Sequence, residues 1–196
     1  VVGHSFGGMT ALGMASGWAG AEPDPRVEAI VPMSSVIRAE LQEDERSGPN
    51  AGFTREQLER ITLPTLLMGG TEDTDVFIEN NRIAFSEIIN SPHVYAVEII
   101  DANHNHFVAN LCDIGNLLIE LGITQDNWPA IGAEELLVPY ETTCTDGAFP
   151  IEEAVRLVNL YVVAFFKRHL LNDERYDAYL TPGFAESEPA ITITVK

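Results

Sequence analysis

Short apolar runs along the chain predict buried β-strands, and the segments between them carry a helical pattern. The runs are continuously apolar or alternate with a period of two, and Val1–Val2 is expected to end a further strand. They span residues 29–33, 65–68 and 95–100. The helical segments span residues 8–18, 54–60 and 76–89. Strands that alternate with helices predict an α/β fold with a mostly parallel sheet flanked by helices.

The remaining segments differ in regularity. A helix is predicted from about residue 151 to 171, and because its apolar residues cover more than one stripe it is expected to be largely buried. We expect lid or loop insertions over residues 39–62 and 108–150. The first segment includes a short helix with Thr54 at its N-cap, and the second includes an apolar helix over residues 111–121. We therefore expect one domain over residues 1–181 and a C-terminal tail over 182–196.

Composition narrows the class of protein. The chain has 196 residues, of which 45% are hydrophobic, enough for one domain with a sizeable core. Thirty acidic against eleven basic residues give a net charge of −19. Such a surface repels phosphate backbones and anionic lipid headgroups, which argues against nucleic-acid binding. No apolar run approaches the ~18 residues that a spanning helix needs, so no membrane span is expected.

The chain has only two cysteines, Cys112 and Cys144. Two are too few for a disulfide scaffold or a zinc site of the CxxC kind. They could form one disulfide, which would stabilise the fold by about 3 to 4 kcal/mol in the chain-entropy model. Two buried free thiols are the alternative. A disulfide would indicate a secreted or periplasmic protein, and free thiols a cytoplasmic one.

The segment Gly3-His4-Ser5-Phe6-Gly7-Gly8 contains the pattern G-x-S-x-G between a strand and a helix. A serine on such a sharp turn is exposed as a nucleophile, and the flanking glycines remove the clashes that the turn would create. The helix N-terminus places main-chain N–H groups, that of Phe6 among them, near a developing oxyanion. A glycine-rich turn with an inert serine is the alternative.

A nucleophilic serine needs a base, and five histidines compete for that role. His4 adjoins the serine, but its side chain is expected to diverge across the turn. His93 precedes a strand at the opposite end of the sheet, and His169 ends a helix, where a cation is favoured for structural reasons. His104 and His106 follow the carboxyl end of a strand, where sites assemble in open parallel sheets.

An acid is available at the same edge of the sheet. The preceding strand ends in Gly69-Gly70-Thr71-Glu72-Asp73-Thr74-Asp75, which offers three carboxylates. The chain order Ser, Asp, His is the order of α/β-hydrolases.

These three segments together resemble the α/β-hydrolase superfamily, and within it the dienelactone-hydrolase and platelet-activating-factor-acetylhydrolase-like group. The resemblance extends over roughly residues 1–181, the C-terminal half of such an enzyme, and includes the final helix. It implies Ser5 as nucleophile, Asp73 as acid and His104 as base, because the family's histidine usually stands three residues before an aromatic, as His104 stands before Phe107. Dienelactone hydrolases proper carry cysteine at the elbow, so the serine favours esters.

Alternatives remain for several roles. His106 could be the base with His104 structural, and Glu72 or Asp75 could be the acid. His104 and His106 could instead form a metal pair completed by Asp101 or Asp113. No third ligand stands at a convincing spacing, so no metal is expected.

The resemblance also implies parts that residues 1–196 do not contain. The second oxyanion donor normally lies on a loop before the elbow, and the family's first strands precede it as well. We therefore expect a fragment whose partner is the N-terminal remainder of the same protein, and which would aggregate through an exposed sheet edge if isolated.

The function expected is a serine hydrolase that cleaves a small carboxylic ester through an acyl-enzyme, without a cofactor. His4, Phe6 and Met9 are expected to line the substrate pocket. Acyl transfer on the same triad is one alternative, and a non-catalytic binding module of this fold is another.

Overall fold

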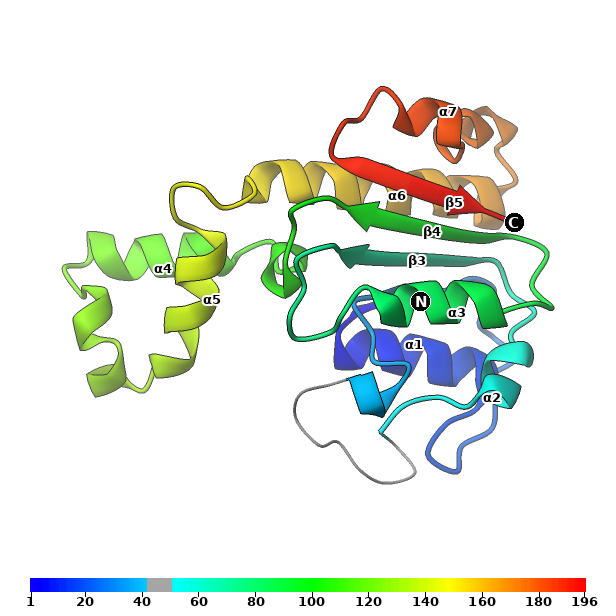
Figure 1. The fold of residues 1–196 in the computed structure, drawn as a ribbon, viewed down its shortest axis with the longest axis horizontal. Helices are drawn as coiled ribbons and strands as arrows, with labels where there is room; N and C mark the ends of the chain where they lie inside the picture. The colour runs from blue at the N-terminus through cyan, green and yellow to red at the C-terminus, as the bar shows by residue number, and fades with distance from the viewer. Residues whose placement is uncertain (42–50) are drawn as a thin grey trace.

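A mixed sheet forms the centre of the protein (Figure 1). The computed structural model describes residues 1–41 and 51–196. Its sheet has five strands in the order β1-β2-β3-β4-β5; the first four are parallel and β5 is antiparallel to β4. The strands are β1 (Val2–His4), β2 (Val31–Met33), β3 (Thr65–Gly70), β4 (Val94–Ile99) and β5 (Ile191–Val195). The predicted α/β class and mostly parallel sheet are confirmed.

Helices cover both faces of this sheet (Figure 1). The α-helices are α1 (Phe6–Ser16), α2 (Arg55–Glu59), α3 (Glu79–Glu87), α4 (Leu111–Glu120), α5 (Leu137–Thr143), α6 (Ile151–Leu171) and α7 (Pro182–Ala185). Short 3₁₀ turns are η1 (Ala39–Leu41), η2 (His104–Phe107), η3 (Gln125–Asn127), η4 (Pro129–Ile131), η5 (Glu134–Leu136) and η6 (Glu174–Tyr179). In β3, Leu67 packs against α1, α2 and α3, whereas Leu66 and Met68 pack against α6. Strand residues therefore meet apolar partners on both faces, as parallel sheets require.

The long helix α6 occupies the predicted range but buries a single face. Its buried residues are Ala154, Leu157, Tyr161, Ala164 and Phe165. They recur at spacings of three and four, whereas Val163 and Leu171 are exposed. The expectation of a largely buried helix is therefore wrong. Within the described part of the chain, no helix has both the length and the apolar character needed to cross a membrane.

The predicted C-terminal tail is instead part of the sheet. Residues 182–185 form α7, and Ile191–Val195 form β5, which pairs with β4 through Ile193 opposite Val97. Ile191 and Ile193 are buried, whereas Thr192 is exposed. This alternation is the period-two pattern of a strand with one buried face.

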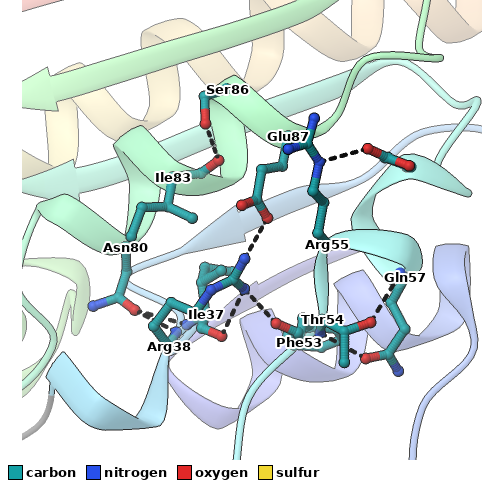
Figure 2. A network of polar contacts seen from close by, with 11 residues as sticks. Ile37, Arg38, Phe53, Thr54, Arg55, Gln57, Asn80, Ile83, Ser86 and Glu87 are labelled. Atoms are coloured by element: carbon teal, nitrogen blue, oxygen red, sulfur yellow. Dashed lines mark hydrogen bonds and ion pairs between the residues drawn. The ribbon is translucent and has the colours of Figure 1, made fainter.

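A polar network fixes the chain on both sides of residues 42–50, which lie outside the described residues (Figure 2). The Asn80 side-chain oxygen accepts the main-chain N–H groups of Ile37 and Arg38, at 2.8 and 3.0 Å. The Arg38 guanidinium donates to the Phe53 carbonyl and pairs with Glu87 at 2.5 Å.

Part of the predicted insertion over residues 39–62 belongs to the core. Phe53, Leu58 and Ile61 are buried against α1 and α3. Thr54 caps α2 in a capping box with Gln57, which confirms that part of the prediction.

Residues 108–150 form a helical excursion, which we call the cap, that stands out from the sheet beyond its carboxyl edge (Figure 1). Trp128 is fully buried inside it, and the Tyr140 ring lies edge-on to Trp128 with centroids 5.2 Å apart. The Tyr140 hydroxyl donates to Asn116 at 2.6 Å. A disulfide joins Cys112 at the start of α4 to Cys144 after α5. The cap thus has a small core of its own. Its disulfide links the outgoing leg, which contains α4, to the returning leg, which runs from α5 to Phe149.

Candidate active site

Ser5 lies on the turn between β1 and α1. Its backbone has φ 55° and ψ −118°, a conformation that a non-glycine residue rarely adopts, and its N–H donates to the Met33 carbonyl at 2.8 Å. The turn closes tightly, since a Cβ on Gly3 would lie 2.2 Å from the Gly7 carbonyl oxygen. Glycine at position 3 therefore permits this turn, and the turn projects Ser5 at the carboxyl edge of the sheet.

The first turn of α1 follows directly. The Phe6 N–H belongs to the first turn of the helix, where main-chain donors lack intrahelical acceptors. The Phe6 ring is 66% exposed and lies 5.6 Å from the Trp18 ring. Met9 differs from the expectation of a pocket residue, because it is buried in the core on the α1 side of the sheet.

Hydrogen bonds join the turn after β3, residues 71–75, to the turn after β4, residues 101–107. We call these the acid turn and the histidine turn. The Glu72 N–H donates to the Ala102 carbonyl and the Asp101 N–H to the Thr71 hydroxyl, each at 3.0 Å. A Cβ on Gly70 would lie 2.1 Å from the Ala102 carbonyl oxygen, so only glycine allows this approach. The acid turn and the histidine turn are consequently held side by side.

This arrangement brings Asp73 and His104 together. His104 Nδ1 lies 2.9 Å from Asp73 Oδ2, and the Asp73 side chain is fully buried. Asp73 Oδ1 accepts the N–H groups of Asp75 and Val76, at 3.0 and 2.7 Å. The alternative acids Glu72 and Asp75 are exposed. Of the three carboxylates, Asp73 is the one that is buried and bonded to a histidine.

The His4 ring packs directly on the His104 ring, with centroids 4.4 Å apart, and is stacked on Phe107 at 5.7 Å. Burial, followed by the positive charge that His104 carries when protonated, lowers the pKa of His4 to about 4. His4 is therefore neutral at pH 7. Its Nε2 is buried and has no hydrogen-bond partner within residues 1–41 and 51–196.

Ser5 follows β1 and His104 lies beyond β4, and these two strands are separated in the sheet by β2 and β3. The His104 ring nevertheless contacts the ring of His4, the neighbour of Ser5. Across the described residues, no hydrogen bond joins the Ser5 hydroxyl to His104. Catalytic hydrogen bonds are often long before substrate binds, so this geometry leaves Ser5 a candidate.

His106, the alternative base, occupies a different environment. It is 1% exposed, its Nε2 lies 2.8 Å from the Phe149 carbonyl, and its Nδ1 lies 2.9 Å from the Asn103 N–H that donates to it. Burial lowers its pKa, so the neutral ring is favoured. Both ring nitrogens are engaged away from Asp73, which leaves His106 neither a base for Ser5 nor a metal ligand.

His93 and His169 lie together at the other end of β4, with ring centroids 4.8 Å apart. His169 Nε2 lies 3.2 Å from the Tyr95 hydroxyl. This pair is remote from the turns that carry Ser5, Asp73 and His104.

One group of side chains offers the donor set of a metal site. Ligand atoms of Asp73, Asp75 and His104 lie within 4.8 Å of one another. An ion bound there would have to replace the hydrogen bond between Asp73 and His104. Beside the same residues a cavity of about 320 Å³ opens between the acid turn, the histidine turn and the cap. Its walls include Glu72, Asp75, His104, Asn105, Val138 and Pro139.

No protein-family model matches the chain, and no curated protein matches it either. Among solved structures, the chain is similar to the esterase domain of a Rhodothermus marinus protein, with 20% identity and a TM-score of 0.40. The match covers 53% of this chain and 51% of that one, so it spans about half of the esterase domain.

Asn103 is the site residue that sequence reasoning missed. It caps η2, and its side chain accepts the Asn105 N–H at 3.0 Å and donates to the Thr142 carbonyl at 3.0 Å. An Asn just before a short helical turn is a capping signal, so its local role was readable from sequence. Its contact with Thr142, 39 residues away, was not.

Proposed function

We propose that the protein is a serine hydrolase of carboxylic esters in which Ser5, His104 and Asp73 act as a catalytic triad. The observation that carries the proposal is the hydrogen bond of 2.9 Å between His104 and the buried Asp73, at the same sheet edge as the strained turn of Ser5. A buried carboxylate bonded to one imidazole nitrogen fixes the tautomer of the ring. The proton then resides on Nδ1, and Nε2 remains free to act as a base.

Each residue then has a definite step. His104 Nε2 takes the proton of the Ser5 hydroxyl as Oγ attacks the ester carbonyl, and the Phe6 N–H donates to the oxyanion. Collapse of this intermediate breaks the ester C–O bond, and His104 returns the proton to the departing alcohol. Water, deprotonated by the same nitrogen, then cleaves the acyl-Ser5 ester and frees the acid. Asp73 stays ionised throughout and stabilises the imidazolium.

Charge narrows the substrate class. The chain carries a net charge of −19, and Glu72 and Asp75 line the cavity next to His104. An anionic substrate would be repelled from such a site, whereas a neutral ester would not. We infer a neutral ester as substrate, part of which occupies the cavity between the histidine turn and the cap.

The proposal is tested by labelling the full-length protein with a fluorophosphonate and locating the adduct by peptide mass spectrometry. The expected result is one adduct, on Ser5, that is absent in Ser5→Ala and forms much more slowly in His104→Ala. Labelling of Ser5 at the same rate in His104→Ala would contradict the assigned base. No adduct on folded protein would contradict the proposal and favour a non-catalytic binding module.

A further inference from the structure

The 3₁₀ turn that carries His104 is fastened on both sides to the returning leg of the cap. Asn103 precedes His104, and its side-chain amide donates to the Thr142 carbonyl at 3.0 Å. Its side-chain oxygen accepts the Thr143 hydroxyl at 3.2 Å. His106 follows His104, and its Nε2 lies 2.8 Å from the Phe149 carbonyl. His104 thus lies between two residues that bond to a segment about 40 residues further along the chain.

The bonds of His106 define one protonation state. Its Nε2 faces the Phe149 carbonyl, which can only accept, so Nε2 carries the proton and donates it. In the neutral ring that burial favours, Nδ1 then accepts the Asn103 N–H at 2.9 Å. Nδ1 also lies 2.8 Å from the Asn103 side-chain oxygen, a contact that protonation of the ring would turn into a hydrogen bond. The side chain is 1% exposed, which leaves it no contact with solvent or substrate.

This geometry gives the cap a role beyond covering the site. The chain leaves the histidine turn into α4 and returns through Thr143 to Phe149. The disulfide between Cys112 and Cys144 joins the two legs of this loop, and Cys144 lies between Thr143 and Phe149. Without the bonds of Asn103 and His106, the hydrogen bonds left to the histidine turn would be those to the acid turn, made by Asp101, Ala102 and His104. The contacts of the His104 and Phe107 rings with His4 would also remain.

We propose that Asn103 and His106 are positioning residues that hold the His104 imidazole against Asp73 by fastening its turn to the returning leg of the cap. The inference rests on the proposed function, because it assigns His104 the role of base. It predicts that loosening this connection at His106 slows the chemical step, although His106 is buried and does not line the cavity beside His104. Asn103 does line that cavity, so the tests below change His106 and Thr143 rather than Asn103. Misplacement of a catalytic group by about 1 Å can cost on the order of 10²-fold in rate.

The first test is His106→Phe in the full-length protein, which keeps an aromatic ring beside Phe149 but removes both hydrogen bonds. With p-nitrophenyl acetate as substrate, kcat should fall by about 10- to 100-fold and KM should change less than about twofold. Here kcat is calculated per active site, with the number of active sites taken from fluorophosphonate titration of Ser5. His106→Gln, whose amide can still donate to Phe149, should recover part of the loss. A role confined to folding would lower the yield of titratable protein and leave kcat per site unchanged, which would overturn the inference.

A spectroscopic readout addresses position directly. In wild type the Nδ1–H of His104, bonded to Asp73, should give a resolved low-field proton resonance. In His106→Phe this resonance should broaden or disappear. A variant that keeps both the resonance and a kcat within about twofold of wild type would refute the positioning role.

A milder pair of variants covers the case in which His106→Phe does not fold. Thr143→Val removes only the hydroxyl bond to Asn103, whereas the matched control Thr145→Val removes a bond to the Glu141 carbonyl within the cap. Thr143→Val should lower kcat several-fold and Thr145→Val should not; equal values would count against the inference. Failure of the proposed function can be told apart from failure of this inference, because the wild-type protein would then form no fluorophosphonate adduct on Ser5.

Discussion

Replacing Asp73 by asparagine tests the assigned chemistry with little change in shape. The side-chain oxygen of the introduced asparagine could still accept the N–H groups of Asp75 and Val76, at the 3.0 and 2.7 Å now seen for Asp73 Oδ1. Its amide group would occupy the place of Oδ2, 2.9 Å from His104 Nδ1, and it can only donate. Nδ1 would have to accept, so the imidazole proton would move to Nε2. Nε2, the nitrogen that we propose takes the Ser5 proton, would then already carry one.

The size of the effect follows from this tautomer change. The same replacement in Ser-His-Asp triads lowers kcat about 10⁴-fold. At about 1.36 kcal/mol for each factor of ten, this raises the activation barrier by about 5.5 kcal/mol. The free energy of unfolding should change by less than ~1 kcal/mol, because the volume is retained, two of the three hydrogen bonds are kept and the third is reversed in direction.

The assay compares the rate constant for fluorophosphonate labelling of Ser5 with urea unfolding followed by circular dichroism. Asp101→Asn serves as the matched control, since Asp101 is exposed and its φ of 63° suits asparagine. Asp101→Asn should label at the wild-type rate. If Asp73→Asn keeps more than a tenth of the wild-type rate while folded, Asp73 does not fix the tautomer of His104.

Three further predictions concern stability. Reducing the Cys112–Cys144 disulfide should lower the free energy of unfolding by about 3 to 4 kcal/mol in the chain-entropy model. Urea unfolding with and without reductant measures this change, and an unchanged midpoint would show that the bridge is not formed. Asn80→Ala leaves the buried N–H of Ile37 without an acceptor, at about 1–3 kcal/mol, and the partly buried N–H of Arg38 at a smaller cost. Asn81→Ala removes a side-chain amide that has no partner among the described residues, so it should cost less; equal losses would contradict this account of Asn80. Burial, followed by the nearby charges of His93 and Arg168, lowers the pKa of His169 to about 4. Between about pH 6.5 and 4 the unfolded state therefore binds more protons than the folded state, and the free energy of unfolding falls as the pH drops through that window. His169→Gln should lose less stability than wild type between about pH 7 and 4.5, and an equal loss would assign the acid sensitivity elsewhere.

The α/β architecture could be predicted from sequence because each parallel strand is an apolar run and each helix has its own period. The strand β5 was missed although its Ile-Thr-Ile-Thr-Val alternation is present, because five residues near acidic and proline-containing sequence resemble a tail until a partner strand is known. Pairing is non-local, and no pattern within residues 191–195 specifies β4 as the partner.

The candidate site shows the same limit. Resemblance to the motifs of α/β-hydrolases pointed to Ser5, Asp73 and His104, and the structure joins the last two by a hydrogen bond. Met9 was expected at the substrate pocket because it follows the elbow, but the helical period directs it into the core. The bonds from Asn103 and His106 to the cap join residues about 40 positions apart, and local sequence rules describe only their capping role.

The position of β5 in the chain affects how the sheet can be completed during synthesis. Every other strand of the sheet, and the whole of the cap, precedes residues 191–195 in the sequence. While these residues are still inside the ribosome, β4 presents an unpaired edge, and unpaired edges template association with other chains. At about 5–20 residues per second, the interval between emergence of β4 and β5 lasts several seconds. During that interval the edge of β4 is open to pairing with another chain, and β5 closes it once it emerges.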